Sequence, residues 1–210
     1  EPLSLIETLK FEPKRGFLRG AAHLDRLARS AKYFGMAFDA KGARRTMAEA
    51  VKGRTAPARI RLELDEKGKL GIAVQNLPPA SAQPWIYAVS DLRVQSCDAL
   101  ARHKTSWRKH LDDEFARLHT KTGCDQVLFL NERGEIAEGN YTNVFVRLGK
   151  RLLTPPLSSG GLDGVFRREL LRTGVCAEAV LYPADLARGA VYFGNSLRGL
   201  IPAVPAGKPG

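Results

Sequence analysis

The residues from 58 to 75 carry the pattern that most restricts the fold of this chain. Apolar residues at positions 58, 60, 62 and 64 alternate with charged ones, and this period of two predicts a strand with one buried face. The segment DEKG then supplies a turn, and KLGIAVQ, 69–75, returns as the second strand of a hairpin. The chain therefore contains at least one antiparallel pair of strands with a core-facing side.

Helices and further strands are expected on both sides of this hairpin. Helical spacing predicts helices at 23–34, 41–51, 109–122 and 162–173. Strand patterns are found at 3–11, 85–94, 125–131, 143–148, 151–156, 175–182 and 190–196. This mixture indicates an α+β fold with two lobes. We predict a small N-terminal lobe over 1–76, a linker rich in proline and alanine over 77–84, and a larger C-terminal lobe over 85–210.

Composition limits the class of protein. The chain has 210 residues, 44% of them hydrophobic, which is enough for a substantial core. No apolar run approaches the roughly 18 residues of a transmembrane helix, and no secretory signal is visible at the N-terminus. The three cysteines are scattered and form no CxxC pair, so we expect neither a disulfide framework nor a metal site. These features predict a cytoplasmic protein that does not enter a membrane.

The formal net charge of +11 allows two classes of partner. Lysine and arginine neutralise phosphates, so one alternative is a basic nucleic-acid-binding module. The basic residues are however spread along the chain among acidic ones, and no nucleic-acid-binding signature is recognisable. The same charge suits an enzyme whose small substrate carries carboxylates or phosphates. We favour the enzyme and expect no nucleic-acid partner.

Four short segments could carry chemistry, although each alone is also explained as an ordinary loop or turn. They are the basic segment around Lys104, the segment EIAEGNYTN around Glu138, the Gly/Ser-rich loop before Val165, and the turn at Ser196. A glycine-rich loop that opens a helix presents backbone amides to a phosphate. A lysine forms a Schiff base with an aldehyde, and a carboxylate can keep a pyridine nitrogen protonated. Together these groups match the requirements of pyridoxal 5'-phosphate (PLP).

The segments also resemble a known family. The chain is similar to the class IV aminotransferases, which are PLP enzymes of fold type IV and include branched-chain aminotransferases, D-amino-acid aminotransferases and 4-amino-4-deoxychorismate lyases. The matching segments occur in the family order between residues 3 and 202. They are LIETLK, FLRGAAHLDRLARSAKYFG, RHKTSWR, DQVLFLNERGEIAEGNYTNVFV, LLTPPLSSGGLDGVFRRELL and NSLRGLIP. The resemblance implies a two-lobed α+β fold with the cofactor between the lobes, and a homodimer.

The resemblance also implies roles for individual residues. Lys104 corresponds to the lysine that holds PLP and moves the proton, and Glu138 to the glutamate that pairs with the pyridine nitrogen. The residues that correspond to the phosphate-binding groups are Arg19, Val165 and Phe166 through their backbone amides, and Ser196. His23, Arg26 and Asn143 belong to the same motifs, and we expect structural roles for them.

Neighbouring cations and departures from the family pattern refine this expectation. Arg102 and Arg108 flank Lys104, and like charges favour the neutral amine that a Schiff base requires. No tyrosine follows Lys104 within the next turn, as one does in branched-chain aminotransferases. Arg108, Asn195 and Arg198 would suit a substrate with more than one carboxylate, such as aminodeoxychorismate. The chain also begins later than is usual in the family.

We therefore expect a PLP enzyme that converts 4-amino-4-deoxychorismate into 4-aminobenzoate and pyruvate. Transamination of a branched-chain or related amino acid with 2-oxoglutarate is the close alternative. Active-site geometry, and not the fold, selects between the two reactions.

Overall fold

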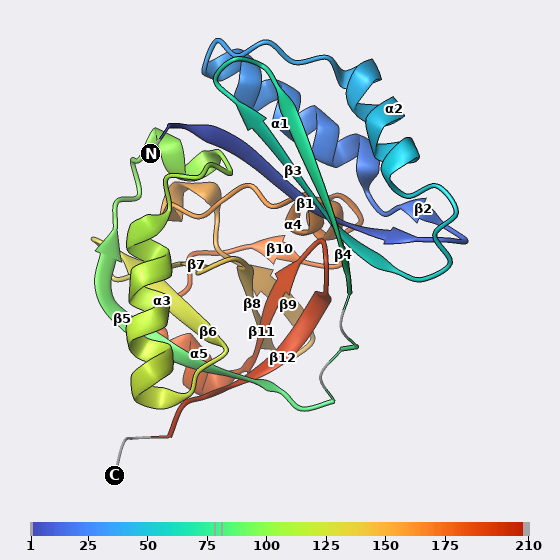
Figure 1. The fold of residues 1–210 in the computed structure, drawn as a ribbon. Helices are drawn as coiled ribbons and strands as arrows, with labels where there is room; N and C mark the ends of the chain where they lie inside the picture. The colour runs from blue at the N-terminus through green and yellow to red at the C-terminus, as the bar shows by residue number, and fades with distance from the viewer. Residues whose placement is uncertain (1, 78, 81, 208–210) are drawn as a thin grey trace. The chain divides into compact units, whose positions relative to one another are not determined.

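The computed structural model describes residues 2–77, 79–80 and 82–207. The chain forms two compact units (Figure 1). Unit 1 contains the chain up to residue 80 together with residues 103–107, and unit 2 contains residues 81–102 and those after 107. The expected linker at 77–84 includes Pro78 and Ser81, which lie outside the described residues. The lobe boundaries given above stay a prediction.

Unit 1 is built on a four-stranded antiparallel sheet with the order β2-β1-β3-β4. Its strands are β1 (Ser4–Glu12), β2 (Gly16–Phe17), β3 (Ala58–Asp65) and β4 (Leu70–Asn76). The register pairs Leu62 with Ile72, so the hairpin predicted from the alternating pattern is confirmed. Two helices, α1 (Gly20–Tyr33) and α2 (Ala40–Ala50), precede this hairpin in the chain.

The alternating apolar residues of unit 1 meet the helices in one core. Leu5 and Leu9 of β1 and Ile60 of β3 are fully buried against Leu24 and Leu27 of α1. Burial of each such side chain contributes roughly 1.5–3 kcal/mol. Charged residues occupy the alternate positions of β3 and are partly exposed. The period of two therefore fixes which sheet face the helices cover.

Unit 2 contains an eight-stranded mixed sheet with the order β10-β9-β8-β11-β12-β5-β6-β7. Its strands are β5 (Trp85–Val94), β6 (Gln126–Asn131), β7 (Ile136–Gly139), β8 (Asn143–Leu148), β9 (Arg151–Thr154), β10 (Ala177–Glu178), β11 (Ala190–Asn195) and β12 (Gly199–Pro205). Strand β5 pairs in parallel with both β6 and β12, whereas β8, β9, β11 and β12 are joined by antiparallel pairs.

Strands from both ends of this sheet contribute to one core. Leu128 of β6, Ile136 of β7, Val144 of β8 and Phe193 of β11 belong to the same buried cluster. Helix α3 (Lys109–Thr122) covers β5 and β6 and ends at Gly123, which has a left-handed backbone. Helix α4 (Val165–Arg172) packs through Phe166 against Phe145 of β8, and α5 (Pro183–Arg188) precedes β11.

Several predicted elements of unit 2 differ from the structure. The helix predicted at 162–173 begins at Val165, because the amide of Leu162 binds a side chain and Gly164 serves as the N-cap. The strand predicted at 175–182 was wrong over most of its length, since only Ala177–Glu178 pairs with β9. The sequence interpretation also missed α5 and β12.

Two negative findings apply to the described part of the chain. Among those residues, no helix is both long and apolar enough to span a membrane. The same residues contain no group of three or more histidine, cysteine or acidic side chains arranged to hold a metal ion.

Candidate functional site

Lys104 lies on a short segment that is attached to β1 in unit 1. Its carbonyl accepts a hydrogen bond of 2.8 Å from the amide of Ile6, and the Ser106 amide donates to the Ser4 carbonyl at 2.9 Å. Between them, Thr105 pairs with Leu5 as an antiparallel bridge and is buried. The segment from Lys104 to Ser106 is therefore held against β1, with a backbone hydrogen bond on each side of Thr105, as if it were part of an added strand.

His103 fixes the same segment to helix α1. Its ring stacks on Tyr33 with a centroid separation of 4.3 Å and meets Phe34 edge-on at 5.1 Å. The Nδ1 atom of His103 is 2.9 Å from the Ser30 hydroxyl. These contacts involve the residue directly before Lys104, so they limit where the base of the lysine side chain can lie.

Arg19 lies at the N-cap of α1 with an unusual backbone. Its φ of 57° makes it the one non-glycine residue with positive φ in the part of the chain that the structure describes. A left-handed arginine is strained by roughly 1–3 kcal/mol, and strain of this kind often marks functional positions. The Arg19 carbonyl accepts from the His23 amide at 3.0 Å, so the residue also starts the helix.

A buried ion cluster below this helix start was not expected from the sequence. Glu7 of β1 accepts two bonds of 2.7 Å from Arg26 and lies 2.6 Å from His23 Nδ1, and all three side chains are buried. Burial alone would raise the pKa of Glu7, but the Arg26 guanidinium, with His23, lowers this pKa to about 2. Burial lowers the pKa of His23, against the effect of the Glu7 carboxylate, and because an ionised carboxylate can only accept, Nδ1 is the donor in this pair.

This cluster explains the His23 and Arg26 motif positions, for which a structural role was expected. Glu7 occupies an odd position of β1, between the core residues Leu5 and Leu9. An acid on the apolar face of a strand needs a buried partner, and this was the signal that the sequence offered. Its partners are 16 and 19 residues away, so no local motif connected them.

Glu138, the acidic residue expected at the cofactor, belongs to unit 2. It lies on β7, is 7% exposed, and accepts a hydrogen bond of 3.0 Å at Oε2 from the amide of Leu162. The loop that carries Leu162 runs close beside β7. A Cβ on Gly161 would lie only 2.8 Å from the Ala137 carbonyl oxygen. A glycine is therefore needed for the loop to reach the glutamate.

The start of α4 is fixed beside this glutamate. Asn143 of β8 donates to the Leu162 carbonyl at 2.8 Å, and its amide oxygen occupies the space that a Cβ on Gly164 would need. Arg167 ties the first turn to the Pro155 carbonyl at 2.8 Å. The Gly164 side of the helix offers no side-chain cap, and the first amides of a helix have no partner within it. Val165 and Phe166 are the first two residues of this helix.

The turn that carries Ser196 lies next to α4. Gly194 of β11 is in register with Asn143 of β8. A Cβ on Gly194 would approach the ring of Phe166 to 3.2 Å, so strand and helix touch here. Ser196 follows in the β11–β12 turn and is 8% exposed. Within unit 2, Leu162 thus connects Glu138 with Asn143 just before α4, and the strand that leads to Ser196 pairs with β8 at Asn143.

The three residues expected at the substrate are placed differently from one another. Arg108 donates to the backbone carbonyl of Asn140. Asn195 uses its side-chain oxygen to accept from the amides of Leu197 and Arg198, at 3.0 and 2.9 Å, and so shapes its own turn. Burial raises the pKa of Tyr141, and the positive charge of Arg198 opposes this shift. The backbone amide of Arg198 lies in the turn that Asn195 shapes.

Comparison with known proteins identifies the family. The model of amino-transferase class IV matches residues 4–204. The chain belongs to this family. Class IV aminotransferases are PLP-dependent enzymes of fold type IV, and the family and fold expected from the motifs are confirmed.

Three relatives illustrate the range of the class IV family. A Mesorhizobium loti protein named "Putative amino-acid aminotransferase" is 40% identical, with a TM-score of 0.91, over 97% of this chain and all of that chain. A Schizosaccharomyces pombe protein named "Putative aminodeoxychorismate lyase" is 25% identical over 94% of this chain and 87% of that protein. Aminodeoxychorismate lyase of Bacillus subtilis is 39% identical over 85 residues, which are 36% of this chain and 28% of that protein. The match to the Bacillus subtilis protein thus spans less than a third of it.

Proposed function

We propose that the chain binds PLP on Lys104 and converts 4-amino-4-deoxychorismate into 4-aminobenzoate and pyruvate. The observation that carries the cofactor part is the buried carboxylate of Glu138, held by the Leu162 amide beside the N-terminus of α4. It is unusual for a buried carboxylate to lie next to a helix N-terminus of the kind that binds phosphate. These two groups correspond to the two ends of PLP, which are a protonated ring nitrogen and a phosphate.

The groups of unit 2 fit this cofactor chemically. A carboxylate suits a pyridinium, whereas backbone amides and a hydroxyl suit a phosphate. Gly161 and Gly164 let the loop approach Ala137 and Asn143 more closely than a side chain would allow, so that the Leu162 amide reaches Glu138. When bound, PLP supplies an electrophilic aldehyde and a ring that withdraws electrons from the substrate.

Each proposed residue then has one task. Lys104 Nζ would hold the cofactor through its aldehyde, and as a free amine it would hold and move a proton. Glu138 keeps the proton on the ring nitrogen. The Arg19 guanidinium, the amides of Val165 and Phe166, and Ser196 bind the phosphate. Arg198, with Arg108 and Asn195, is proposed to bind substrate carboxylates. We also propose that the enzyme is a homodimer.

The proposed lyase reaction is supported by the Schizosaccharomyces pombe relative, whose match extends over 94% of this chain. The absence of a tyrosine in the turn after Lys104 favours the same reaction. A specific observation favours the second candidate, transamination with 2-oxoglutarate. The Mesorhizobium loti protein, at 40% identity, is more similar to this chain than the Schizosaccharomyces pombe protein, at 25%, and its name is that of an amino-acid aminotransferase.

The decisive experiment offers PLP-loaded protein both substrates separately. With aminodeoxychorismate, we expect equal amounts of 4-aminobenzoate and pyruvate, measured by chromatography and by a coupled dehydrogenase assay. With leucine and 2-oxoglutarate, we expect no glutamate above the level of Lys104→Ala, which serves as the control. Formation of glutamate without 4-aminobenzoate would replace the lyase assignment with the transaminase one.

A further inference from the structure

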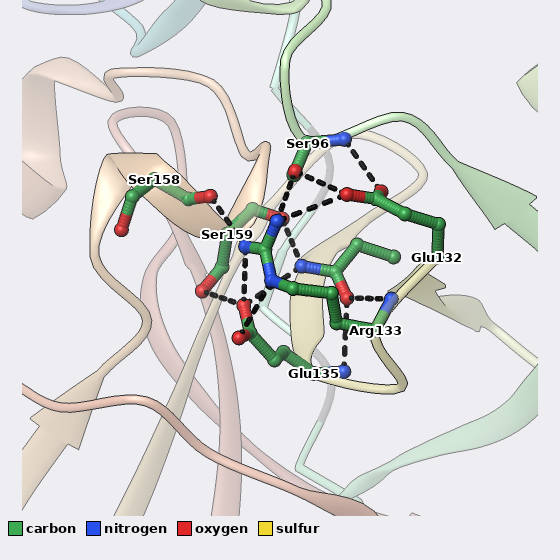
Figure 2. A network of polar contacts seen from close by, with 7 residues as sticks. Ser96, Glu132, Arg133, Glu135, Ser158 and Ser159 are labelled. Atoms are coloured by element: carbon green, nitrogen blue, oxygen red, sulfur yellow. Dashed lines mark hydrogen bonds and ion pairs between the residues drawn. The ribbon is translucent and has the colours of Figure 1, made fainter.

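A polar network in unit 2 lies at the opposite end of β7 from Glu138. Its centre is Arg133 in the β6–β7 turn, and Figure 2 shows the guanidinium surrounded by its partners. Arg133 donates to both oxygens of Glu135 at 2.9 and 2.8 Å, to Glu132 at 2.9 Å, and to the Ser158 carbonyl at 2.8 Å. It also bonds the hydroxyl of Ser96, which follows β5. One side chain thus connects three separate segments.

The buried part of this network holds the loop before α4. The Ser159 hydroxyl donates to Glu135 Oε2 at 2.9 Å, and Asn131 donates to the Ser159 carbonyl at 3.1 Å and to Glu135 Oε2 at 2.8 Å. Asn131 and Ser159 are fully buried, and Glu135 is 8% exposed. Hydrogen bonds to a charged group contribute more than neutral ones, so Glu135 is the strongest attachment point of the loop.

The loop and β7 run side by side and are tied at both ends. Glu135 holds Ser159, and three residues further along each segment Glu138 holds Leu162 (138 − 135 = 3 and 162 − 159 = 3). Between these ties lie Gly160, with a φ of +99°, and Gly161. A Cβ on Gly160 would lie 2.9 Å from the Ser96 Cα, so this part of the loop has no spare room. A shift at Ser159 is therefore transmitted to the Leu162 amide.

We propose that Glu135, held by Arg133, is a positioning residue that orients the Glu138 carboxylate toward the ring nitrogen of PLP. This inference rests on the proposed function. The Leu162 amide fixes Oε2 of Glu138, and a donor fixed on one oxygen sets the plane of the whole carboxylate. Glu135 sets the position of that amide through Ser159.

The test uses two matched variants of the β6–β7 turn. Glu135→Gln removes the charge that holds Ser159. Glu132→Gln removes a neighbouring charge that also contacts Arg133. The described hydrogen bonds of the Glu132 side chain come from Ser96 and Arg133, and none comes from residues 158–162. Each apo-protein is titrated with PLP and with 1-deaza-PLP, in which a C–H group replaces the ring nitrogen. Only PLP can report on the contact between the nitrogen and Glu138.

We expect Glu135→Gln to raise the Kd for PLP about 10-fold or more, the effect of one charge-assisted hydrogen bond, and to leave the Kd for the deaza analogue within about twofold. Glu132→Gln should change both constants much less, because Glu132 binds Ser96 and Arg133 and not Ser159. An equal rise in the Kd for PLP and for 1-deaza-PLP would overturn the inference, because Glu135 would then serve only the local structure. An unchanged Kd for PLP would also overturn it, because Glu135 would then have no effect on the contact at the ring nitrogen. Ser159→Ala removes the hydroxyl that donates to Glu135 but keeps the ion pair of Glu135 with Arg133. It provides the same comparison if Glu135→Gln does not fold. Failure of the wild-type protein to bind PLP would instead overturn the proposed function.

Discussion

At the scale of single residues, Glu138 is the group whose chemistry the proposal uses most directly. We predict that Glu138→Ala still binds PLP at saturating concentration through the phosphate groups and Lys104, with a Kd raised at least as much as in Glu135→Gln, and that it loses roughly 10²-fold or more in turnover. Steady-state rates and the absorbance of bound PLP measure both quantities. Asp113→Ala, which changes an exposed acid on α3, is the control and should keep the wild-type rate. An unchanged rate in Glu138→Ala would mean that another group protonates the ring.

Glu7 provides a second prediction, which concerns stability and pH. Glu7→Gln removes the carboxylate that pairs with the buried Arg26 charge, so it should lower the free energy of unfolding at pH 7 by about 3–5 kcal/mol. Urea unfolding followed by circular dichroism measures this change. Glu12→Gln, on the same strand but not buried, should have little effect.

The pH dependence of this effect has a definite sign. The pKa of Glu7 is lowered from 4.5 to about 2 in the folded chain. The stabilisation is thus fully present above pH 4.5 and is lost as the pH falls from 4.5 toward 2. The difference in unfolding free energy between wild type and Glu7→Gln should accordingly shrink between pH 5 and pH 3. A constant difference over this range would contradict the ionised state of Glu7.

At the scale of elements, the loop from 158 to 164 determines how β7 and α4 are joined. Gly161→Ala would bring a Cβ to 2.8 Å from the Ala137 carbonyl oxygen, which is backbone and can yield only if the loop shifts. We predict that this substitution costs about 1–3 kcal/mol of stability and weakens PLP binding, because the shift moves the Leu162 amide and the start of α4. Thermal unfolding and PLP titration measure the two effects.

A glycine elsewhere in the chain supplies the comparison for this prediction. A Cβ on Gly71 of β4 would have its nearest neighbour at 3.7 Å, an ordinary contact, so Gly71→Ala should change neither property appreciably. Wild-type PLP affinity in Gly161→Ala would show that the loop can adjust without disturbing the site.

The elements that the sequence predicted well are those in which one local pattern decides the structure. The alternation in β3 and β4 gave the hairpin and its buried face, and Lys109–Thr122 has both helical spacing and a terminal glycine. The start of α4 was predicted three residues early, because contacts to Glu138 and Asn143, far away in sequence, hold residues 162–164 out of the helix. The missed helix α5 did carry a local signal, since proline at a first helical position favours a helix start.

The candidate site shows the same limit. Motif order singled out Lys104, Glu138 and the helix start at Val165, because each motif is short and local. Glu7, Glu135 and Leu162 were missed, since their roles depend on partners 16 to 24 residues away that only the fold brings close. The assignment of PLP-binding residues remains a proposal, and the arrangement of groups around Asn143 is the structural argument for it.

At the scale of the whole molecule, the two units are interleaved in sequence. Residues 103–107 belong to unit 1, although the residues before and after them belong to unit 2. The backbone hydrogen bonds from Ile6 to Lys104 and from Ser106 to Ser4 hold this segment on β1 of unit 1. The residue on which the whole account depends is Lys104.

The most direct test of the account is therefore to locate PLP on the chain. Purified protein is incubated with PLP, reduced with borohydride, digested, and mapped by mass spectrometry. We predict one modified peptide, with the cofactor bound covalently to Lys104, and loss of both this peptide and the visible absorbance band in Lys104→Ala. A modified peptide on a different lysine, or an unchanged band in Lys104→Ala, would contradict the assignment.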